Sequence, residues 1–215
     1  MNCCHNPQCL GIEKIFNEDW ARRELEGYRK DGPSKTTRIL LDALQQQGVE
    51  GATLLDIGGG IGAIQHALLK AGVTRAVSVE ASPAYLEISR REAERLGLAE
   101  RITFLGGDFV SLAPQIEPAD IVTLDRVICC FDDMPGLVRL SAARARRLYG
   151  VIYPRDTWWI KGGIALFNAA QWLLRNPFRV FAHPTREIDE IVRGQGFERV
   201  FYHRGLFWQV FVYRK

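Results

Sequence analysis

A glycine cluster between two apolar runs constrains the fold of this chain more than any other feature. In 54-LLDIGGGIGAIQ-65, an apolar run carrying Asp56 leads into four glycines, and an apolar helical pattern follows. A glycine loop between a strand and a helix commonly holds a nucleotide, because its backbone can approach the ligand closely. The sequence therefore predicts a nucleotide-type cofactor site at Gly58, Gly59, Gly60 and Gly62.

Strand and helix patterns alternate around and after this loop. Strands are expected at 53–57, 76–79, 102–105, 121–124 and 151–153, and helices at 63–71, 83–96 and 134–148. Such alternation predicts a parallel sheet with helices on both faces. A helix over 184–194 and a closing hairpin, 199–202 with 208–213, add two strands, the last of them reversed. The expected fold is an α/β, Rossmann-like sheet of seven strands, mostly parallel, with a small helical cap.

The segments outside this alternation predict the cap. Residues 1–47 are expected to form an N-terminal helical segment, in which Ser34 starts a helix after Pro33. Residues 48–215 are expected to form the cofactor-binding domain, with the apolar stretch 157–180 inserted into it. The whole chain is expected to be one structural domain.

The composition argues against several classes of protein. The formal charge is only +3 and no Lys/Arg run exceeds three residues, so a nucleic-acid partner is not expected. The segment Arg144–Arg147 is expected to be the cationic last turn of a helix. The longest apolar stretch, 158–174, falls short of the ~20 residues of a membrane span, so no membrane insertion is expected. The first residues lack the apolar core of a signal peptide, which favours a cytoplasmic location; an oligomer is left open.

Asp56 separates the nucleotides that a glycine loop could hold. A P-loop requires a lysine after its last glycine, and none follows Gly62. Gly58, Gly60 and Ala63 match the dinucleotide pattern only weakly. The Asp56 carboxylate would repel a pyrophosphate at ~4 Å by about 4 kcal/mol before screening. S-adenosylmethionine (SAM) carries an ammonium and a sulfonium there and no phosphate, so Asp56 favours SAM over NAD.

Acidic residues also end the next strands. Glu80 lies 22 residues after Gly58, where a carboxylate can accept hydrogen bonds from ribose hydroxyls. Asp108 could accept from the adenine amino group, with Phe109 against the ring. Each acid alone could be a solvated loop residue, but their order along the strand ends favours a cofactor site. The remaining expected cofactor-binding residues follow two of these strands: Ala81, Ser82, Asp125, Arg126 and Val127.

With these motifs, the sequence resembles the class I SAM-dependent methyltransferases. The motifs are 56-DIGGGIG-62, Glu80, 107-GDF-109 and 122-VTLDRV-127, and the resemblance covers about residues 30–215. It implies the same sheet with a reversed last strand and SAM as cofactor.

The layout is also similar to a smaller group, the magnesium-protoporphyrin O-methyltransferases. The similar segments are 15–44, 125–131, 151–159 and 182–197. In that group a tyrosine and a histidine lie near the methyl transfer site. Tyr28 corresponds to the tyrosine and Cys129 to the histidine position, and His183 is a further catalytic candidate.

The candidate acceptor-binding residues are Tyr28, Arg155, Trp158 and Trp159. Structural interpretations stay open beside the functional ones. Arg155 could instead form a surface ion pair with Asp156, and the tryptophans could be core. His183 could simply open a helix, and Cys129 with Cys130 could be small buried hydrophobes.

No metal site is expected. Cys3, Cys4, His5 and Cys9 are soft ligands, but their spacing is not that of a structural zinc site. Asp125 and Asp156 end strands where some methyltransferases bind Mg²⁺, but no Asp-Asn pair follows.

The predicted function is transfer of a methyl group from SAM to a small-molecule acceptor, on oxygen or nitrogen. The alternatives are an inactive SAM-binding regulatory module and, less favoured, a nicotinamide-dependent oxidoreductase. Residues 157–180 are expected to cover the acceptor pocket, with Ile164, Phe167 and Leu174 on one helical face and Trp172 near its edge. A membrane-surface helix is the alternative, disfavoured by the scarcity of basic residues on its polar side.

Overall fold

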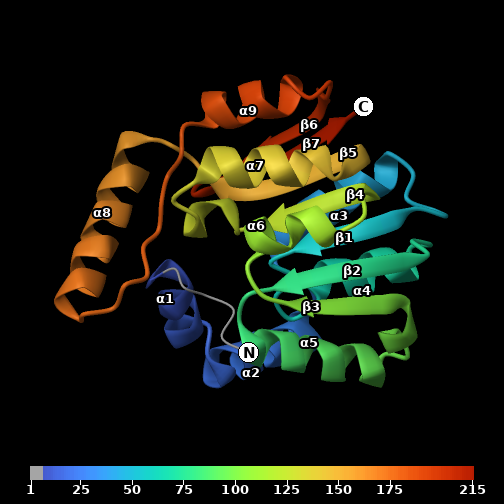
Figure 1. The fold of residues 1–215 in the computed structure, drawn as a ribbon, viewed down its shortest axis with the longest axis horizontal. Coiled ribbons are helices and arrows are strands. Elements are labelled where there is room, and N and C mark those ends of the chain that lie inside the picture. Colours follow the sequence, from blue (N-terminus) through green and yellow to red (C-terminus); the bar gives the residue numbers. More distant parts are fainter. Residues whose placement is uncertain (1–6) are drawn as a thin grey trace.

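A seven-stranded sheet forms the centre of the molecule (Figure 1). The computed structural model describes residues 7–215, so Cys3, Cys4 and His5 lie outside the described part. The strand order is β3-β2-β1-β4-β5-β7-β6. The strands are β1 (Thr53–Ile57), β2 (Arg75–Glu80), β3 (Ile102–Gly106), β4 (Ala119–Asp125), β5 (Ala145–Pro154), β6 (Glu198–Arg204) and β7 (Trp208–Arg214). β7 runs antiparallel to both β5 and β6, so the predicted sheet with its reversed last strand is confirmed.

Helices cover both faces of this sheet, as the alternation predicts. One face carries α3 (Lys35–Gln46), α4 (Ala63–Lys70) and α5 (Pro83–Arg95), which bury apolar side chains such as Leu40, Leu68 and Ala93 against the strands. The other carries α6 (Phe109–Leu112), α7 (Met134–Ala143) and α9 (Thr185–Arg193) over a second apolar cluster. Short 3₁₀ turns lie at η1 (Ala99–Arg101), η2 (Ala113–Gln115) and η3 (Ile128–Cys130).

The remaining helices gather beyond the carboxyl ends of the parallel strands. These are α1 (Pro7–Ile15), α2 (Glu18–Asp31) and α8 (Trp158–Leu173). Figure 1 shows α1 and α8 beyond that edge of the sheet, with an extended segment returning from α8 to α9. The strand order reverses between β1 and β4, and in sheets of this kind ligands bind at that edge and that reversal. The fold therefore places the three helices over its expected ligand site.

One local prediction is wrong. The segment Arg144–Arg147 is not the cationic end of a helix, because α7 ends at Ala143 and β5 begins at Ala145. Ala145 is buried opposite Ala119 of β4, Arg146 is exposed and Leu148 is buried again. Pairing with β4 and β7 overrides the local helical preference of this arginine-rich stretch.

Candidate active site

A cavity of about 1160 Å³ lies at the reversal between β1 and β4. It is larger than a typical single-ligand pocket of about 300–1,000 Å³, so it has room for a cofactor and a second small molecule. Its walls come from the loops after β1 to β4, from α2 and α8, and from the start of β7. Most residues that the sequence predicts for the site line it: Tyr28, Asp56, Gly58, Gly59, Gly60, Glu80, Ala81, Asp108, Phe109, Asp125, Arg126, Val127 and Cys129.

The glycine loop after β1 can adopt its path only without side chains. Gly58, Gly60 and Gly62 have φ values of 66°, 55° and 89°, in the left-handed region that favours glycine. A Cβ on Gly58 would lie 2.3 Å from the Val127 side chain. The loops after β1 and β4 are therefore in direct contact, and together they form the floor of the cavity.

Asp56 offers the cavity an unpaired buried oxygen. Its side chain is 1% exposed, and Oδ1 accepts a hydrogen bond of 2.7 Å from the Thr123 hydroxyl. Among the described residues, Oδ2 has no partner. Burial raises the pKa of Asp56 to about 7, although the Thr123 bond opposes this shift. A buried carboxylate in this state gains a partner when a cationic ligand binds beside it.

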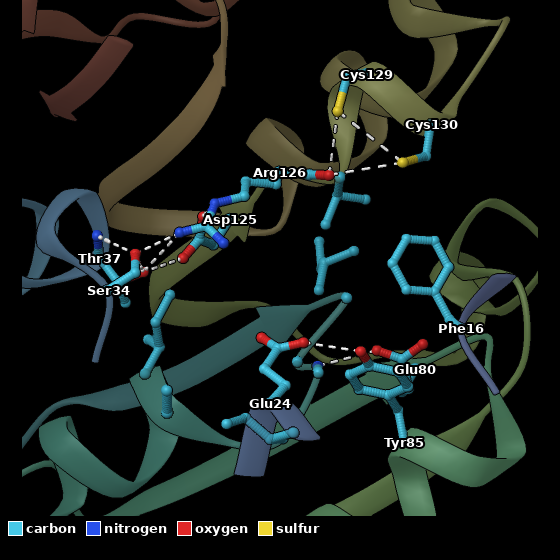
Figure 2. A pocket seen from close by; sticks show the side chains of 18 of the residues that line it. Phe16, Glu24, Ser34, Thr37, Glu80, Tyr85, Asp125, Arg126, Cys129 and Cys130 are labelled. Carbon is cyan, nitrogen blue, oxygen red and sulfur yellow. Dashed lines mark hydrogen bonds and ion pairs between the residues drawn. The ribbon is translucent and has the colours of Figure 1, made fainter. Parts of the chain in front are cut away.

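Glu80 and Glu24 add carboxylates to the same side of the cavity. Glu80 ends β2 and accepts from the backbone N–H groups of Gly60 at 2.9 Å and Ser82 at 2.8 Å. Burial raises the pKa of Glu80, while these backbone bonds oppose the shift. Glu24 of α2 accepts from the Tyr85 hydroxyl at 2.7 Å. In Figure 2 the Glu24, Tyr85 and Glu80 side chains meet on one side of the pocket.

The loop after β3 is organised by Asp108. Its carboxylate caps α6 by accepting from the Val110 N–H at 3.1 Å and the Ser111 hydroxyl at 3.0 Å. Phe109 is 3% exposed and lines the cavity. Asp108 and Phe109 therefore both lie at this wall of the cavity. Their contact with an adenine stays a prediction.

Arg126 joins the end of β4 to the start of α3. Its φ is 62°, an uncommon conformation for a residue other than glycine. Its guanidinium lies 3.3 Å from the Asp125 carboxylate and donates to the hydroxyls of Ser34 and Thr36. Asp125 in turn accepts from the Thr37 hydroxyl at 2.6 Å. The arrangement holds the charged group at the cavity wall (Figure 2).

Two adjacent thiols face the cavity beside this loop. Their sulfurs are 3.9 Å apart, and both donate to the carbonyl oxygen of Arg126, Cys129 at 3.2 Å and Cys130 at 3.7 Å. The contact between its sulfur and that of Cys130, together with burial, raises the pKa of Cys129 well above its usual value. Burial also raises the pKa of Tyr28. Both groups are therefore protonated donors near neutral pH.

An aromatic series closes the cavity on the side of the cap; we define it as Tyr85, Phe16, Phe178 and Phe167. Neighbouring rings contact edge to face, with centroids 5.8, 5.8 and 6.5 Å apart in that order. All four residues line the cavity, and they come from α5, the α1–α2 connection, the segment after α8, and α8. Contacts of this geometry stabilise by roughly 0.5–1.5 kcal/mol each beyond burial.

Several predicted residues lie outside the cavity wall. Trp158 is 85% exposed and Trp159 is 39% exposed, because α8 buries Ile160 and Ile164 instead. Arg155 donates to the carbonyls of Gly205 and Leu206. These three residues therefore do not meet the residues of the glycine loop.

Three further predicted residues support the wall without lining it. His183 lies 2.8 Å from the Phe131 carbonyl through Nε2, and burial lowers its pKa. Ser82 caps α5 and donates to the Phe16 carbonyl at 2.6 Å, and Gly62 begins α4 against His66. Each of them positions an element of the site.

Sequence reasoning missed residues that only the fold brings to the cavity, above all Glu24, Phe16 and Phe178. Glu24 had a usable signal. It is four residues from both Trp20 and Tyr28, and this spacing places the three side chains on one face of α2. All three line the cavity.

Two searches of residues 7–215 bear on other kinds of site. Among residues 11–215, whose side chains the structure describes, no group of three or more His, Cys, Asp or Glu side chains is placed to hold a metal ion. No helix within the same residues is long and apolar enough to cross a membrane.

Comparison with known proteins agrees with this geometry. Residues 54–147 match the family model described as a methyltransferase domain. Ribosomal protein L11 methyltransferase of Pectobacterium carotovorum is 33% identical over 90 residues, 42% of this chain and 28% of the relative. Arginine N(omega)-methyltransferase of Streptomyces achromogenes is 30% identical over 128 residues, 57% of this chain and 36% of the relative. The match thus spans only about a third of these curated relatives.

The likeness to solved structures extends over the whole chain. Magnesium protoporphyrin IX methyltransferase from Synechocystis, crystallised with SAH, superposes with a TM-score of 0.72 at 18% identity. The superposition covers 98% of this chain and 100% of that one. Residues 54–147 therefore form a methyltransferase domain, and the chain has the fold of the class I SAM-dependent methyltransferases, in a layout that resembles the magnesium-protoporphyrin enzyme.

Proposed function

We propose that the protein is an enzyme that transfers a methyl group from SAM to an oxygen or nitrogen of a small-molecule acceptor. The proposal rests on one observation: two chemically different halves belong to the same cavity of about 1160 Å³. One half is acidic and built on the glycine loop, and the other is aromatic and built on the cap. The role of each residue below is part of this proposal.

The acidic half fits SAM. Asp56 would hold the cationic amino-acid end, since its Oδ2 is buried without a partner among the described residues. Glu80 would accept from the ribose hydroxyls, and Asp108 with Phe109 would contact the adenine. When bound, SAM supplies a methyl group activated by a sulfonium. A nicotinamide dinucleotide fits less well, because its pyrophosphate would face the Asp56 carboxylate.

The acceptor half provides position rather than a base. Tyr28 and Cys129 keep their protons, since the pKa of each is raised. The Tyr28 hydroxyl can donate a hydrogen bond that orients an acceptor, whereas the Cys129 thiol already donates to the Arg126 carbonyl. The aromatic series can exclude water from the acceptor. Holding the two reactants in line can supply effective molarities on the order of 10⁵ M or more. The acceptor atom would therefore bring its own lone pair, as a carboxylate, phenolate or amine does.

The enclosed aromatic half favours a small molecule over a protein side chain. Ribosomal protein L11 methyltransferase and arginine methyltransferase share only part of this chain. The superposition with the magnesium protoporphyrin IX enzyme includes the cap, which supports an acceptor enclosed by α2 and α8. Trp20, Phe167 and Trp208 replace Trp158 and Trp159 as candidate aromatic contacts, because they line the cavity.

Binding and turnover measurements test the proposal separately. Calorimetry should show micromolar affinity for SAH and none for NAD. Asp56→Ala and Glu80→Ala should each weaken SAH binding by about 1.5–3 kcal/mol, as expected for hydrogen bonds to charged groups. Tight NAD binding, or unchanged SAH affinity in both variants, would contradict the cofactor assignment.

A panel of carboxylate, phenol and amine acceptors, with SAH release as the signal, tests catalysis. SAH binding without turnover of any acceptor in the panel would support the inactive regulatory module instead.

A further inference from the structure

Helix α8 exposes a broad apolar surface. Five of the large apolar side chains on α8 and its C-cap are at least 72% exposed: Trp158 85%, Leu166 75%, Trp172 72%, Leu173 76% and Leu174 74%. Lys161 is the single charged residue among the sixteen of the helix. With 3.6 residues per turn, Trp158, Leu166, Trp172 and Leu173 fall within about 120° of one another around the helix, and Leu174 follows at the C-cap. Isolated exposed apolar residues are ordinary in folded proteins, but a face of this kind marks an interaction site. We call these five residues the α8 apolar face.

The exposure of this face is fixed by contacts on the opposite side of the helix. Ile160 and Ile164 are buried there. The Asn168 side chain forms two hydrogen bonds with the backbone of Val180, donating to its carbonyl at 2.8 Å and accepting from its N–H at 2.9 Å. Phe178 in the same returning segment is 3% exposed. α8 therefore holds one orientation, with the α8 apolar face outward.

Charge and aromatic placement indicate what this face contacts. Tryptophans stand at both ends of the helix, at Trp158 and Trp172, and basic residues lie at Lys161, Arg175 and Arg179. Residues 157–183 contain no Asp or Glu. Tryptophan rings favour the boundary between lipid headgroups and acyl chains, and each Lys or Arg near an anionic bilayer contributes about 1 kcal/mol.

The sequence alone disfavours a membrane-surface helix, because its polar side has few basic residues; in the structure the side opposite the α8 apolar face instead packs on the protein through Ile160, Ile164 and Asn168. We propose that α8 binds the surface of an anionic lipid bilayer, with the α8 apolar face in the boundary between headgroups and acyl chains. A second protein usually meets an apolar patch surrounded by a polar rim that forms hydrogen bonds. Around the α8 apolar face the small residues Gly162, Ala165 and Ala169 are exposed instead, and every charged residue within 157–183 is basic. The helix lies along the membrane, since no described helix is long enough to span one.

This placement also indicates the class of acceptor. Gly163, Ile164 and Phe167 of the same helix line the cavity. A bilayer against α8 would therefore lie one helix diameter from the aromatic half of the site. We infer that the acceptor is an amphiphile that reaches the cavity from the lipid side; this second statement rests on the proposed function.

Vesicle flotation of the full chain tests the docking. Vesicles of phosphatidylcholine alone are compared with vesicles containing about 30% phosphatidylglycerol. We expect at least tenfold tighter binding to the anionic vesicles, with a blue shift of tryptophan emission. Trp158→Ala/Trp172→Ala should weaken binding at least tenfold, and Lys161→Glu/Arg175→Glu should do the same on anionic vesicles only.

A matched control variant makes the same change in net charge at exposed positions outside α8. Arg91→Glu/Arg186→Glu changes the net charge equally on α5 and α9, at side chains that are 69% and 90% exposed. This control should bind anionic vesicles within twofold of the parent protein. Equal weakening by the control would show that net charge, and not α8, drives the binding.

Other outcomes would overturn the proposal. If the parent protein does not float with anionic vesicles, α8 is not a lipid-binding helix. If Trp158→Ala/Trp172→Ala instead converts a dimer to a monomer in sedimentation, the face joins two copies of the chain. Vesicle binding needs no catalysis, so its failure is distinct from failure of methyl transfer. If vesicles bind but an acceptor carrying an acyl chain, presented in those vesicles, releases SAH no faster than its water-soluble counterpart, the amphiphile inference fails alone.

Discussion

Asp56 is a buried acid with one unsatisfied oxygen, and this makes cofactor affinity depend on pH. Its pKa is raised to about 7, so the carboxyl is neutral below that pH and charged above it. Only the charged form attracts an ammonium. We therefore expect SAH affinity to fall as pH is lowered from 8 to 6, approaching tenfold per unit below the pKa.

Calorimetry at pH 6, 7 and 8 measures this dependence. Asp56→Asn should bind SAH weakly with a flat profile. Asp120→Asn is the matched control. Asp120 lies at the start of β4, at the opposite edge of the sheet from the cavity, and accepts a hydrogen bond from the Thr53 N–H. An Asp56→Asn protein that keeps the slope of the parent would rule out Asp56 as the titrating group.

His66 makes a separate contribution to stability in acid. It is fully buried beside Gly62, and neither ring nitrogen has a partner among the described residues. Burial lowers its pKa to about 4, so the unfolded chain binds a proton more readily below about 6.5. The stability that neutral His66 contributes is present above that pH and is lost as pH falls from 6.5 to 4, by about 3 kcal/mol at most.

Urea unfolding at pH 7.5 and 4.5 tests this contribution. His66→Gln should lose less stability than the parent between these values. The loss of stability is compared between the parent and the variant, because both contain Asp56 and Glu80. The raised pKa values of these two acids change the stability of each protein in the opposite direction. Equal losses in the two proteins would remove His66 as an acid-sensitive group.

At this scale the sequence identifies the residues that line the cavity around the glycine loop better than those that line it under the cap. Asp56, Glu80 and the glycines follow from chemistry at strand ends, which is local in sequence. The contact of Phe16 with Phe178 depends on how two distant segments pack, and no local pattern encodes it. His183 and Arg155 are also candidates from the sequence. In the structure their side chains form hydrogen bonds with backbone carbonyl groups of Phe131 and Gly205 instead of lining the cavity.

At the scale of elements, a buried carboxylate adds to the Tyr85–Glu24 bond in holding α2 on α5. Glu92 is fully buried and accepts from Arg29 of α2 at 2.5 Å and from Arg95 at 2.6 Å. The hydrogen bonds from Arg95 and Arg29 lower the pKa of Glu92 to about 2. Because α2 carries Glu24 and Tyr28 into the cavity, this anchor sets the position of one wall.

We expect Glu92→Gln to destabilise the protein by about 2–3 kcal/mol, the cost of hydrogen bonds to a charged group. SAH affinity should fall at least threefold as α2 loosens. Glu87→Gln on the same helix removes an exposed pair with Arg91 and should cost under about 1 kcal/mol. Thermal denaturation and calorimetry measure both; equal effects of the two substitutions would mean that the anchor has no special role.

The elements also show where sequence patterns stop being informative. Helix α8 is apolar nearly all round, so periodicity cannot decide which face is buried. Of the face expected from spacing, Ile164 and Phe167 line the cavity, whereas Leu174 is exposed, as is the acceptor-binding candidate Trp158. The order of strands and helices is better determined, since each element has a strong pattern and a marked end, as at Ser34 before α3.

At the scale of the whole molecule, the first helix closes on a distant segment. A Cβ on Gly11 of α1 would lie 2.4 Å from the backbone nitrogen of Phe178. Backbone cannot move aside as a side chain can, so Gly11→Ala should separate α1 from the returning segment. Overpacking of this kind costs roughly 1–3 kcal/mol, or about 2–4 °C of melting temperature per kcal/mol for a chain of this size.

Differential scanning calorimetry, with limited proteolysis of residues 174–184, tests this contact. Gly11→Ala should lower the melting temperature and expose the segment to cleavage. Gly162→Ala is the control, because a Cβ there meets nothing within 4 Å and alanine favours the helix. Wild-type behaviour of Gly11→Ala would show that α1 does not depend on the close approach.

The contact between Gly11 and Phe178 has a consequence for the order of events during synthesis. α1 is synthesised before the strands of the sheet, yet its docking surface includes Phe178, which is made after β5 and α8. Until that segment emerges, the nascent chain can assemble β1 to β4 but cannot close the aromatic series over them. The growing chain thus forms the glycine-loop side of the cavity before the aromatic series that closes it. The complete cavity can form only after Phe178 has been synthesised.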